Sequence, residues 1–282
     1  MNSKILVTGG MGTVGSYAKA AFNESAVFIM GRMDLDITNV NQIKKVFDKI
    51  KPTVVIHLAA LTNVDLCEKN PDLAKKINAD GTKNMTLIAK KYNIPFVYIS
   101  TSAVFDGKNL PNEGYSEEDQ PHPANVYAKT KLLGEEIVKE NIKDYIIVRG
   151  AWMIGGGKKE KKFISYIFDK IKNGETLRVV NDRFGTLTYA KDLLEFVKER
   201  LSRKEFGLFH FGSKGMCSRF DIANFIKKEF RSNSIIEPVS SKEFAEQFPA
   251  PRPTYEVIKS VKFPLTSSWQ TTLKNYMEND LL

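Results

Sequence analysis

The chain of 282 residues is long enough to bury a substantial core, and its length fits one large domain or two modest ones. Hydrophobic residues make up 42% and charged residues 27% of the sequence, so disordered and membrane classes are poor fits. No apolar stretch approaches the roughly 18 residues of a membrane span, and the net charge of +9 comes from lysines scattered through helical segments, a pattern typical of a solvated surface rather than of nucleic-acid binding.

The N-terminus and the cysteines bear on the compartment and on metal binding. The first residues run directly into a strand-like segment and lack the basic, apolar and cleavage regions of a signal peptide, so we expect a cytoplasmic protein. Cys67 and Cys217 are far apart and form no Cys-x-x-Cys motif, which predicts reduced thiols. The histidines show no metal-ligand spacing. We therefore expect no metal and no membrane or nucleic-acid partner.

Strand-like and helix-like segments alternate through the first 150 residues. Short apolar, β-branched runs predict strands at residues 4–7, 27–30, 54–58, 96–99 and 145–148. Amphipathic runs predict helices at residues 14–22, 39–50, 71–92 and 126–140, with Thr38 as the N-cap of the second. Such alternation implies parallel pairing with right-handed crossovers, and so an α/β fold with a Rossmann-type doubly wound parallel sheet.

The pattern loosens after residue 150. Three glycines at 155–157 and the charged run Lys158–Lys162 predict a loop, which we interpret as solvated, with contact to a diphosphate as the alternative. A helix at 189–201 and a strand at 208–211 follow. We expect a dinucleotide-binding domain over 1–150, with its sheet completed by about 183–212. Residues 151–182 and 213–282 would form a smaller C-terminal substrate-binding subdomain.

A glycine-rich turn joins the first predicted strand to the first predicted helix. Its glycines give Gly-x-x-Gly-x-x-Gly, although Gly10 leaves the register slightly ambiguous. Such a turn needs positive φ, bare backbone near a pyrophosphate and close packing of helix on strand. The helix N-terminus then faces the phosphates. We expect cofactor contacts from Gly9, Gly12, Thr13, Val14 and Gly15.

The end of the second predicted strand bears on the choice of cofactor. An acidic residue there would hold a ribose 2′-hydroxyl, whereas an arginine would pair with a 2′-phosphate. Arg32 favours NADPH and Asp34 opposes it, so NADH stays open as the alternative. Asp36 and Ile37 are expected beside the adenine.

Tyr127 and Lys131 are four residues apart in a predicted helix and so share one face. A neighbouring ammonium favours phenolate and predicts a lowered Tyr127 pKa, which would suit proton transfer to an alkoxide. The preceding strand ends in Ser100-Thr101-Ser102, where a hydroxyl would polarise a carbonyl. Two other pairs have the same spacing but follow no such strand end: Tyr166 with Lys170, and Tyr255 with Lys259.

With these motifs in order, the chain resembles the dTDP-4-dehydrorhamnose reductase family over nearly its whole length. The resemblance is carried by several short stretches, at residues 35–38, 59–65, 77–81, 98–101, 104–107, 125–131, 149–152, 184–193 and 250–253. It implies an NAD(P)H-dependent reductase acting on a nucleotide-linked 4-keto-6-deoxyhexose, in deoxysugar or polysaccharide biosynthesis.

The resemblance also implies roles for individual residues. Hydride would pass to sugar C4, Tyr127 would supply the proton, Lys131 would tune it and bind the nicotinamide ribose, and Thr101 would bind the reacting oxygen. Further cofactor contacts are implied for Ala59, Ala60, Leu61 and Asn78. The implied substrate contacts are Ser102, Trp152, which would pack on the sugar ring, and Arg252 near the diphosphate.

The chain departs from the family pattern on the substrate side. Ser102-Ala103 stand where the family commonly has Asp-Tyr, and the Ser and Asp of the C-terminal Arg-Pro-x-x-Ser-x-Leu-Asp pattern are absent from Arg252–Lys259. These changes suggest a related reductase with a different sugar, or a divergent enzyme. A sugar-nucleotide epimerase on the same scaffold and a non-catalytic, cofactor-binding regulatory subunit, as in methionine adenosyltransferase, remain alternatives. Either a monomer or a homodimer is compatible with the sequence.

Overall fold

The computed structural model describes residues 3–111, 113–157, 163–265 and 267–282, and the charged run predicted as a loop at 158–162 lies outside them. A central sheet has the strand order β10-β5-β4-β3-β1-β2, and every neighbouring pair is parallel. Its strands are β1 (Lys4–Thr8), β2 (Ala26–Met30), β3 (Val54–His57), β4 (Phe96–Thr101), β5 (Tyr145–Gly150) and β10 (Gly207–Phe211). The predicted Rossmann-type doubly wound sheet is confirmed.

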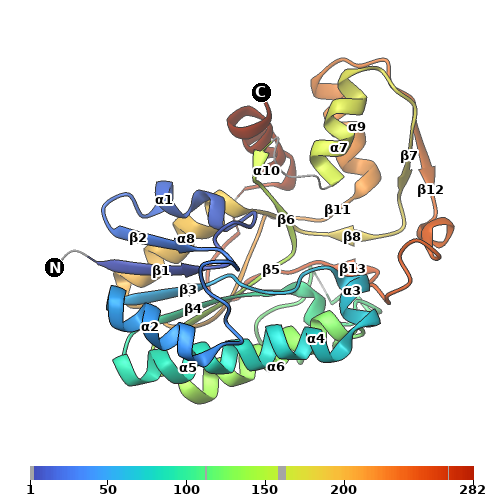
Figure 1. Cartoon of the computed structure of the whole chain (residues 1–282). Coiled ribbons are helices and arrows are strands. Elements are labelled where there is room, and N and C mark those ends of the chain that lie inside the picture. The colour runs from blue at the N-terminus through green and yellow to red at the C-terminus, as the bar shows by residue number, and fades with distance from the viewer. Residues whose placement is uncertain (1–2, 112, 158–162, 266) are drawn as a thin grey trace.

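Helices cover both faces of this sheet (Figure 1). On one face lie α2 (Val40–Ile50), α5 (Gly81–Tyr92) and α6 (Val126–Asn141), and on the other α1 (Ala18–Ala21) and α8 (Ala190–Arg203). Successive strand residues point to opposite faces. Accordingly, Leu6 packs in the cluster with α2 and α5, whereas Ile5 and Val7 pack in the cluster with α1 and α8. Burial on both faces explains the continuous apolar strands in the sequence.

Local details differ from the sequence predictions at three helices. The first begins with a 3-10 turn, Gly15–Tyr17, before α1. Asn39 rather than Thr38 is the N-cap of α2, because its side chain accepts from the amides of residues 41 and 42, while Thr38 donates to Asp36. The helix expected at 71–92 is divided into α4 (Pro71–Lys75), a π-helical turn (Lys76–Asp80) and α5.

The remaining elements form small sheets and a second helical group. They include β6 (Trp152–Ile154), α7 (Phe163–Lys172), β7 (Leu177–Val180), β8 (Phe184–Gly185), β9 (Leu187–Tyr189), β11 (Cys217–Ser218), α9 (Arg219–Glu229), β12 (Ile236–Val239), β13 (Tyr255–Glu256) and α10 (Trp269–Tyr276). Helices α7, α9 and α10 lie on the side of the sheet away from α2, α5 and α6 (Figure 1) and share an apolar cluster of their own. The division into a dinucleotide-binding domain and a substrate-binding subdomain stays a prediction.

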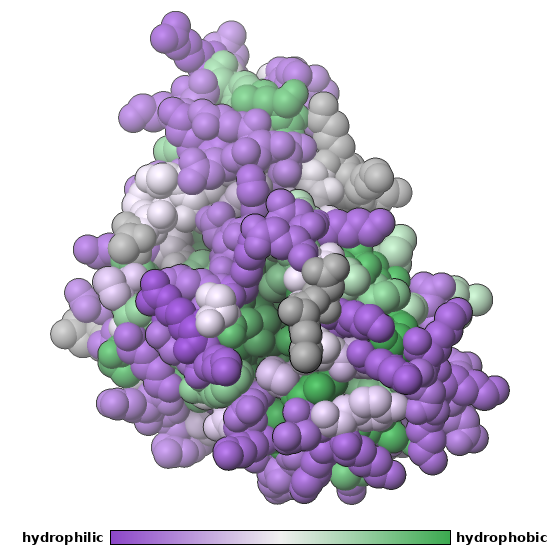
Figure 2. Space-filling view, turned by 90° about the vertical axis from the view of Figure 1, so that its left-hand side faces the viewer, coloured by the Kyte–Doolittle hydropathy of each residue, from purple (hydrophilic) through white to green (hydrophobic). Residues whose placement is uncertain are grey.

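The surface is largely hydrophilic. On the face shown in Figure 2, hydrophilic side chains cover most of the outline, and hydrophobic atoms are visible in a hollow near its middle. Within the described ranges, no helix is both long enough and apolar enough to cross a bilayer.

Candidate active site

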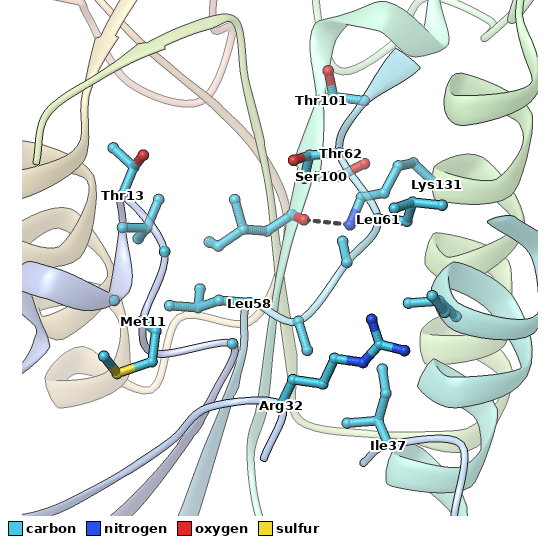
Figure 3. A pocket seen from close by; sticks show the side chains of 18 of the residues that line it. Met11, Thr13, Arg32, Ile37, Leu58, Leu61, Thr62, Ser100, Thr101 and Lys131 are labelled. Carbon is cyan, nitrogen blue, oxygen red and sulfur yellow. Dashed lines mark hydrogen bonds between the residues drawn. The ribbon is translucent and has the colours of Figure 1, made fainter. Parts of the chain in front are cut away.

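A cavity of about 650 Å³ opens at the carboxyl ends of β1, β3 and β4, where ligands bind in open α/β sheets. Arg32 lies at one end of the cavity and Thr101 at the other (Figure 3). The glycine turn and the segment after β3 line the space between them. The cavity is therefore elongated along the sheet edge, as an extended dinucleotide requires.

The glycine turn approaches its neighbours so closely that side chains are excluded. Gly9 has a φ of +65°, and a Cβ on it would lie 2.5 Å from the Ala59 amide nitrogen. A Cβ on Gly15 would lie 2.3 Å from the Gly10 carbonyl oxygen. The bare backbone of the turn faces the cavity, which fits a pyrophosphate.

Cations predominate at the Arg32 end. Arg32 and Lys76 both line the cavity. Hydrogen bonds from Thr38 lower the pKa of Asp36, and the positive charges of Arg32 and Lys76 add to this effect. Asp34, the residue expected to oppose a 2′-phosphate, accepts a hydrogen bond from the Gly31 amide at 2.8 Å. That carboxylate caps its own turn, and this end of the cavity suits a phosphate.

Two buried polar side chains support the cavity wall from behind. The Thr82 hydroxyl donates to the Asn78 carbonyl at 2.7 Å, so its oxygen is left to accept from His57 Nε2 at 3.2 Å. The other ring nitrogen, His57 Nδ1, then accepts from the Thr8 hydroxyl at 2.7 Å. Burial lowers the pKa of His57 to about 3, so this histidine is neutral and fully satisfied. The Asn78 side chain bonds both the amide (2.7 Å) and the carbonyl (3.1 Å) of Leu61, which lines the cavity.

Tyr127 lies at the Thr101 end of the cavity, in the first turn of α6. Its phenol is hydrogen-bonded to Thr101, which lowers the pKa, but burial outweighs this and raises the pKa to about 12. The predicted lowering of the Tyr127 pKa by Lys131 is therefore wrong. The phenol is protonated at neutral pH, the form that a proton donor requires.

Lys131 is buried one turn further along α6. Its ammonium donates to the Ile99 carbonyl at 2.8 Å, drawn in Figure 3, and lies 3.9 Å from the centre of the Tyr98 ring. Burial lowers the pKa of Lys131 to about 7, although the negative charge of Glu135 opposes the shift. Lys131 therefore titrates near neutral pH.

The structure separates this Tyr-Lys pair from another with the same spacing. Tyr166 is 58% exposed, and the Lys170 ammonium lies 5.3 Å from its ring centre on the surface of α7. In contrast, Tyr127 and Lys131 line the same cavity as the glycine turn. Position in the fold, not spacing, distinguishes the two.

Most of the residues singled out from the sequence meet in this one cavity. It is lined by Gly9, Gly12, Thr13, Val14, Gly15, Arg32, Asp36, Ile37, Ala59, Ala60, Leu61, Thr101, Tyr127 and Lys131. Four others do not line it: Asn78, Ser102, Trp152 and Arg252. Asn78 holds the Leu61 backbone, and Arg252 is paired with Asp65 (2.5 Å).

Some lining residues were missed by the sequence analysis. Met11, Lys76, Ser100 and Met153 all face the cavity. Ser100 belongs to the hydroxyl-bearing strand end, so the motif itself contained that signal. Lys76 lies in the π-helical turn, and a turn of this kind leaves no recognisable pattern in the sequence. Its place in the cavity depends on the way the helices pack.

Comparisons with known proteins agree with this geometry. The family model described as "RmlD substrate binding domain" matches residues 3–281. A dTDP-4-dehydrorhamnose reductase of Aggregatibacter actinomycetemcomitans is 30% identical, over 97% of this chain and 98% of that protein. The chain belongs to the dTDP-4-dehydrorhamnose reductase family.

Two further proteins are similar to this chain over nearly its whole length. The spore coat polysaccharide biosynthesis protein SpsK of Bacillus subtilis is 30% identical, over 98% of this chain and 97% of that protein. The crystal structure of the Bacillus anthracis dTDP-4-dehydrorhamnose reductase in complex with NADP superimposes with a TM-score of 0.92 at 33% identity, covering 99% of each chain. The family likeness thus extends over both the glycine turn and the C-terminal elements.

Proposed function

We propose that this protein is an NADPH-dependent reductase of a nucleotide-linked 4-keto-6-deoxy sugar, acting in cytoplasmic deoxysugar or polysaccharide biosynthesis as a monomer or homodimer. The observation that carries the proposal is the convergence of Thr101, Tyr127 and Lys131 on the cavity that the glycine turn lines. Family membership supports it, as does the NADP bound by the Bacillus anthracis relative. We assign residues 151–182 and 213–282 to the substrate side.

The residues present fit a dinucleotide phosphate. The glycine turn would hold the pyrophosphate, Arg32 and Lys76 a 2′-phosphate, and Ile37 the adenine. When bound, the nicotinamide supplies the hydride that reduces the sugar carbonyl. Lys131 lines the same cavity as Tyr127, where its ammonium would also meet the nicotinamide ribose.

Proton transfer falls to the Thr101 end of the cavity. Tyr127 is neutral and carries the proton that the reduced carbonyl oxygen needs. Thr101, already hydrogen-bonded to the phenol, would bind the same oxygen and orient it. Lys131 would stabilise the phenolate that remains after transfer, because a positive charge favours the ionised phenol.

The direct test is reduction of a panel of nucleotide-linked 4-keto-6-deoxy sugars, followed by loss of NADPH absorbance. Stoichiometric oxidation of NADPH with formation of the 4-hydroxy sugar is expected for at least one substrate. An epimerase would instead return an isomer without net NADPH consumption. NADPH binding with no turnover of any panel member would favour a regulatory subunit and contradict the proposal.

Arg32 should set the preference for NADPH over NADH. Arg32→Gln removes a guanidinium suited to the 2′-phosphate, a group that NADH lacks. We expect kcat/KM for NADPH to fall about 10–100-fold, with NADH changed by less than about threefold. Arg178→Gln, at an exposed arginine on β7, is the matched control. Equal losses with both cofactors would refute the assignment.

The reductase should lose activity as the pH rises through about 7. Lys131 has a pKa lowered to about 7, so it is charged below this pH and neutral above it, whereas Tyr127 stays protonated up to about 12. Neutral Lys131 no longer favours the phenolate. A pH profile of kcat/KM should therefore show an alkaline limb near 7 that is absent from Lys131→Met. A wild-type profile that is flat from pH 6 to about 9 would contradict this role.

A further inference from the structure

Glu256 is an acidic side chain beside the proposed proton donor. It ends the short strand β13, where it pairs with Gly185 of β8, and its side chain is half-buried. One carboxylate oxygen accepts from the Trp152 indole at 3.1 Å, and the other accepts from the Ser102 hydroxyl at 3.3 Å. These two donors are the residues that the family resemblance placed on the substrate side.

The carboxylate is coupled to the catalytic end of the cavity. Ser102 directly follows Thr101, and Thr101 is hydrogen-bonded to the Tyr127 phenol. Burial is the main cause of the raised pKa of Tyr127, and the negative charge of Glu256 adds to it. Trp152 follows Ala151, which lines the cavity. Glu256 thus contacts two residues that directly follow residues lining the Thr101 end of the cavity.

The surrounding residues hold this carboxylate in place. A Cβ on Gly185 would lie 2.5 Å from the Trp152 indole, so the glycine lets the indole lie against β8. The Arg219 guanidinium lies 5.2 Å from the centre of the same ring. Burial raises the pKa of Glu256, and the hydrogen bond from Trp152 and the positive charge of Arg219 oppose this rise. A carboxylate has about four acceptor sites, and the described residues use only two of them here.

We propose that Glu256 accepts a hydrogen bond from the sugar hydroxyl on the carbon next to the reacting carbonyl, and so selects keto sugars that carry this hydroxyl. The inference rests on the proposed reductase function and adds a specificity-determining residue to it. Serine stands at this place in the family's C-terminal pattern; it is shorter and neutral. At a separate position, Ser102 and Ala103 stand where the family commonly has acidic and phenolic residues, and Glu256 supplies an acidic group there from another strand.

The test compares two substrates in the wild-type protein, in two Glu256 variants and in a control variant. One substrate is a nucleotide-linked 4-keto-6-deoxy sugar, and the other is its analogue with hydrogen in place of the C3 hydroxyl. Wild-type protein should prefer the hydroxylated substrate in kcat/KM by about 10–100-fold, the worth of a hydrogen bond to a charged acceptor. Glu256→Gln should reduce this preference about tenfold or more. Glu237→Gln, at an exposed glutamate of β12, should leave it unchanged.

The ratio between the two substrates separates specificity from other effects. A change in the Tyr127 pKa, in NADPH binding or in folding acts on both substrates and leaves their ratio unchanged. Glu256→Ser, which restores the family residue, should lower the ratio at least as far. This second variant is needed because a glutamine amide oxygen can also accept a hydrogen bond from the C3 hydroxyl. An unchanged ratio in both variants, with wild-type turnover intact, would overturn this inference alone. Absence of wild-type turnover on any keto sugar would overturn the proposed function and this inference with it.

Discussion

Replacing Tyr127 with phenylalanine should lower kcat for keto-sugar reduction by about 10²–10⁴-fold, the usual contribution of a positioned acid. The substitution removes one oxygen from a half-buried ring and leaves the helix α6 and the apolar contacts intact. NADPH affinity should change little, because the glycine turn and the Arg32 end are untouched. Steady-state kinetics with cofactor titration by fluorescence would measure both quantities.

Tyr166→Phe is a matched control for this variant. It changes the same atom in a Tyr-x-x-x-Lys pair of identical spacing, but on the exposed surface of α7. Its kcat should equal that of the wild type. Wild-type turnover in Tyr127→Phe, or an equal loss in both variants, would show that Tyr127 is not the proton donor.

Arg149→Met should lower the free energy of unfolding by about 3–5 kcal/mol, the cost of leaving one partner of a buried ion pair uncompensated. Arg149 is 2% exposed and makes two hydrogen bonds to Glu135, at 2.8 and 2.7 Å. Glu135 is fully buried and also accepts from Ser100, a cavity residue, at 2.5 Å. The pair therefore joins α6 and β5 directly beneath the site.

Urea unfolding at pH 7 would measure this loss. Arg203→Met is the control, because its pair with Glu199 on α8 is exposed and such pairs contribute little. The double variant Arg149→Met with Glu135→Leu should recover part of the lost stability, since it removes the unpaired charge as well. A single variant as stable as the wild type would show that this ion pair does not support the site.

The sequence predicted the strands of the main sheet and the glycine turn well, because each is encoded by residues close together in the chain. Each β strand carries its own apolar pattern, and the glycine turn contains its own backbone requirement, so both are visible without knowledge of the neighbours. Predictions were less accurate where two local choices compete. Asn39 displaces Thr38 as the cap because Thr38 bonds to Asp36 instead, and the π-helical turn at Lys76–Asp80 interrupts a segment whose pattern is continuous.

The sequence by itself determined the positions of the strands of the main sheet, the glycine turn and the Tyr127–Lys131 face, because each depends on residues close together in the chain. Only the tertiary structure determined the pKa values and the long-range contacts at the site. The pKa of Tyr127 is raised rather than lowered because burial outweighs its neighbours. Glu256 reaches Ser102 across 154 positions of the chain because β13 pairs with β8. Burial and long-range contacts are properties of the packed chain, so no local pattern contains them.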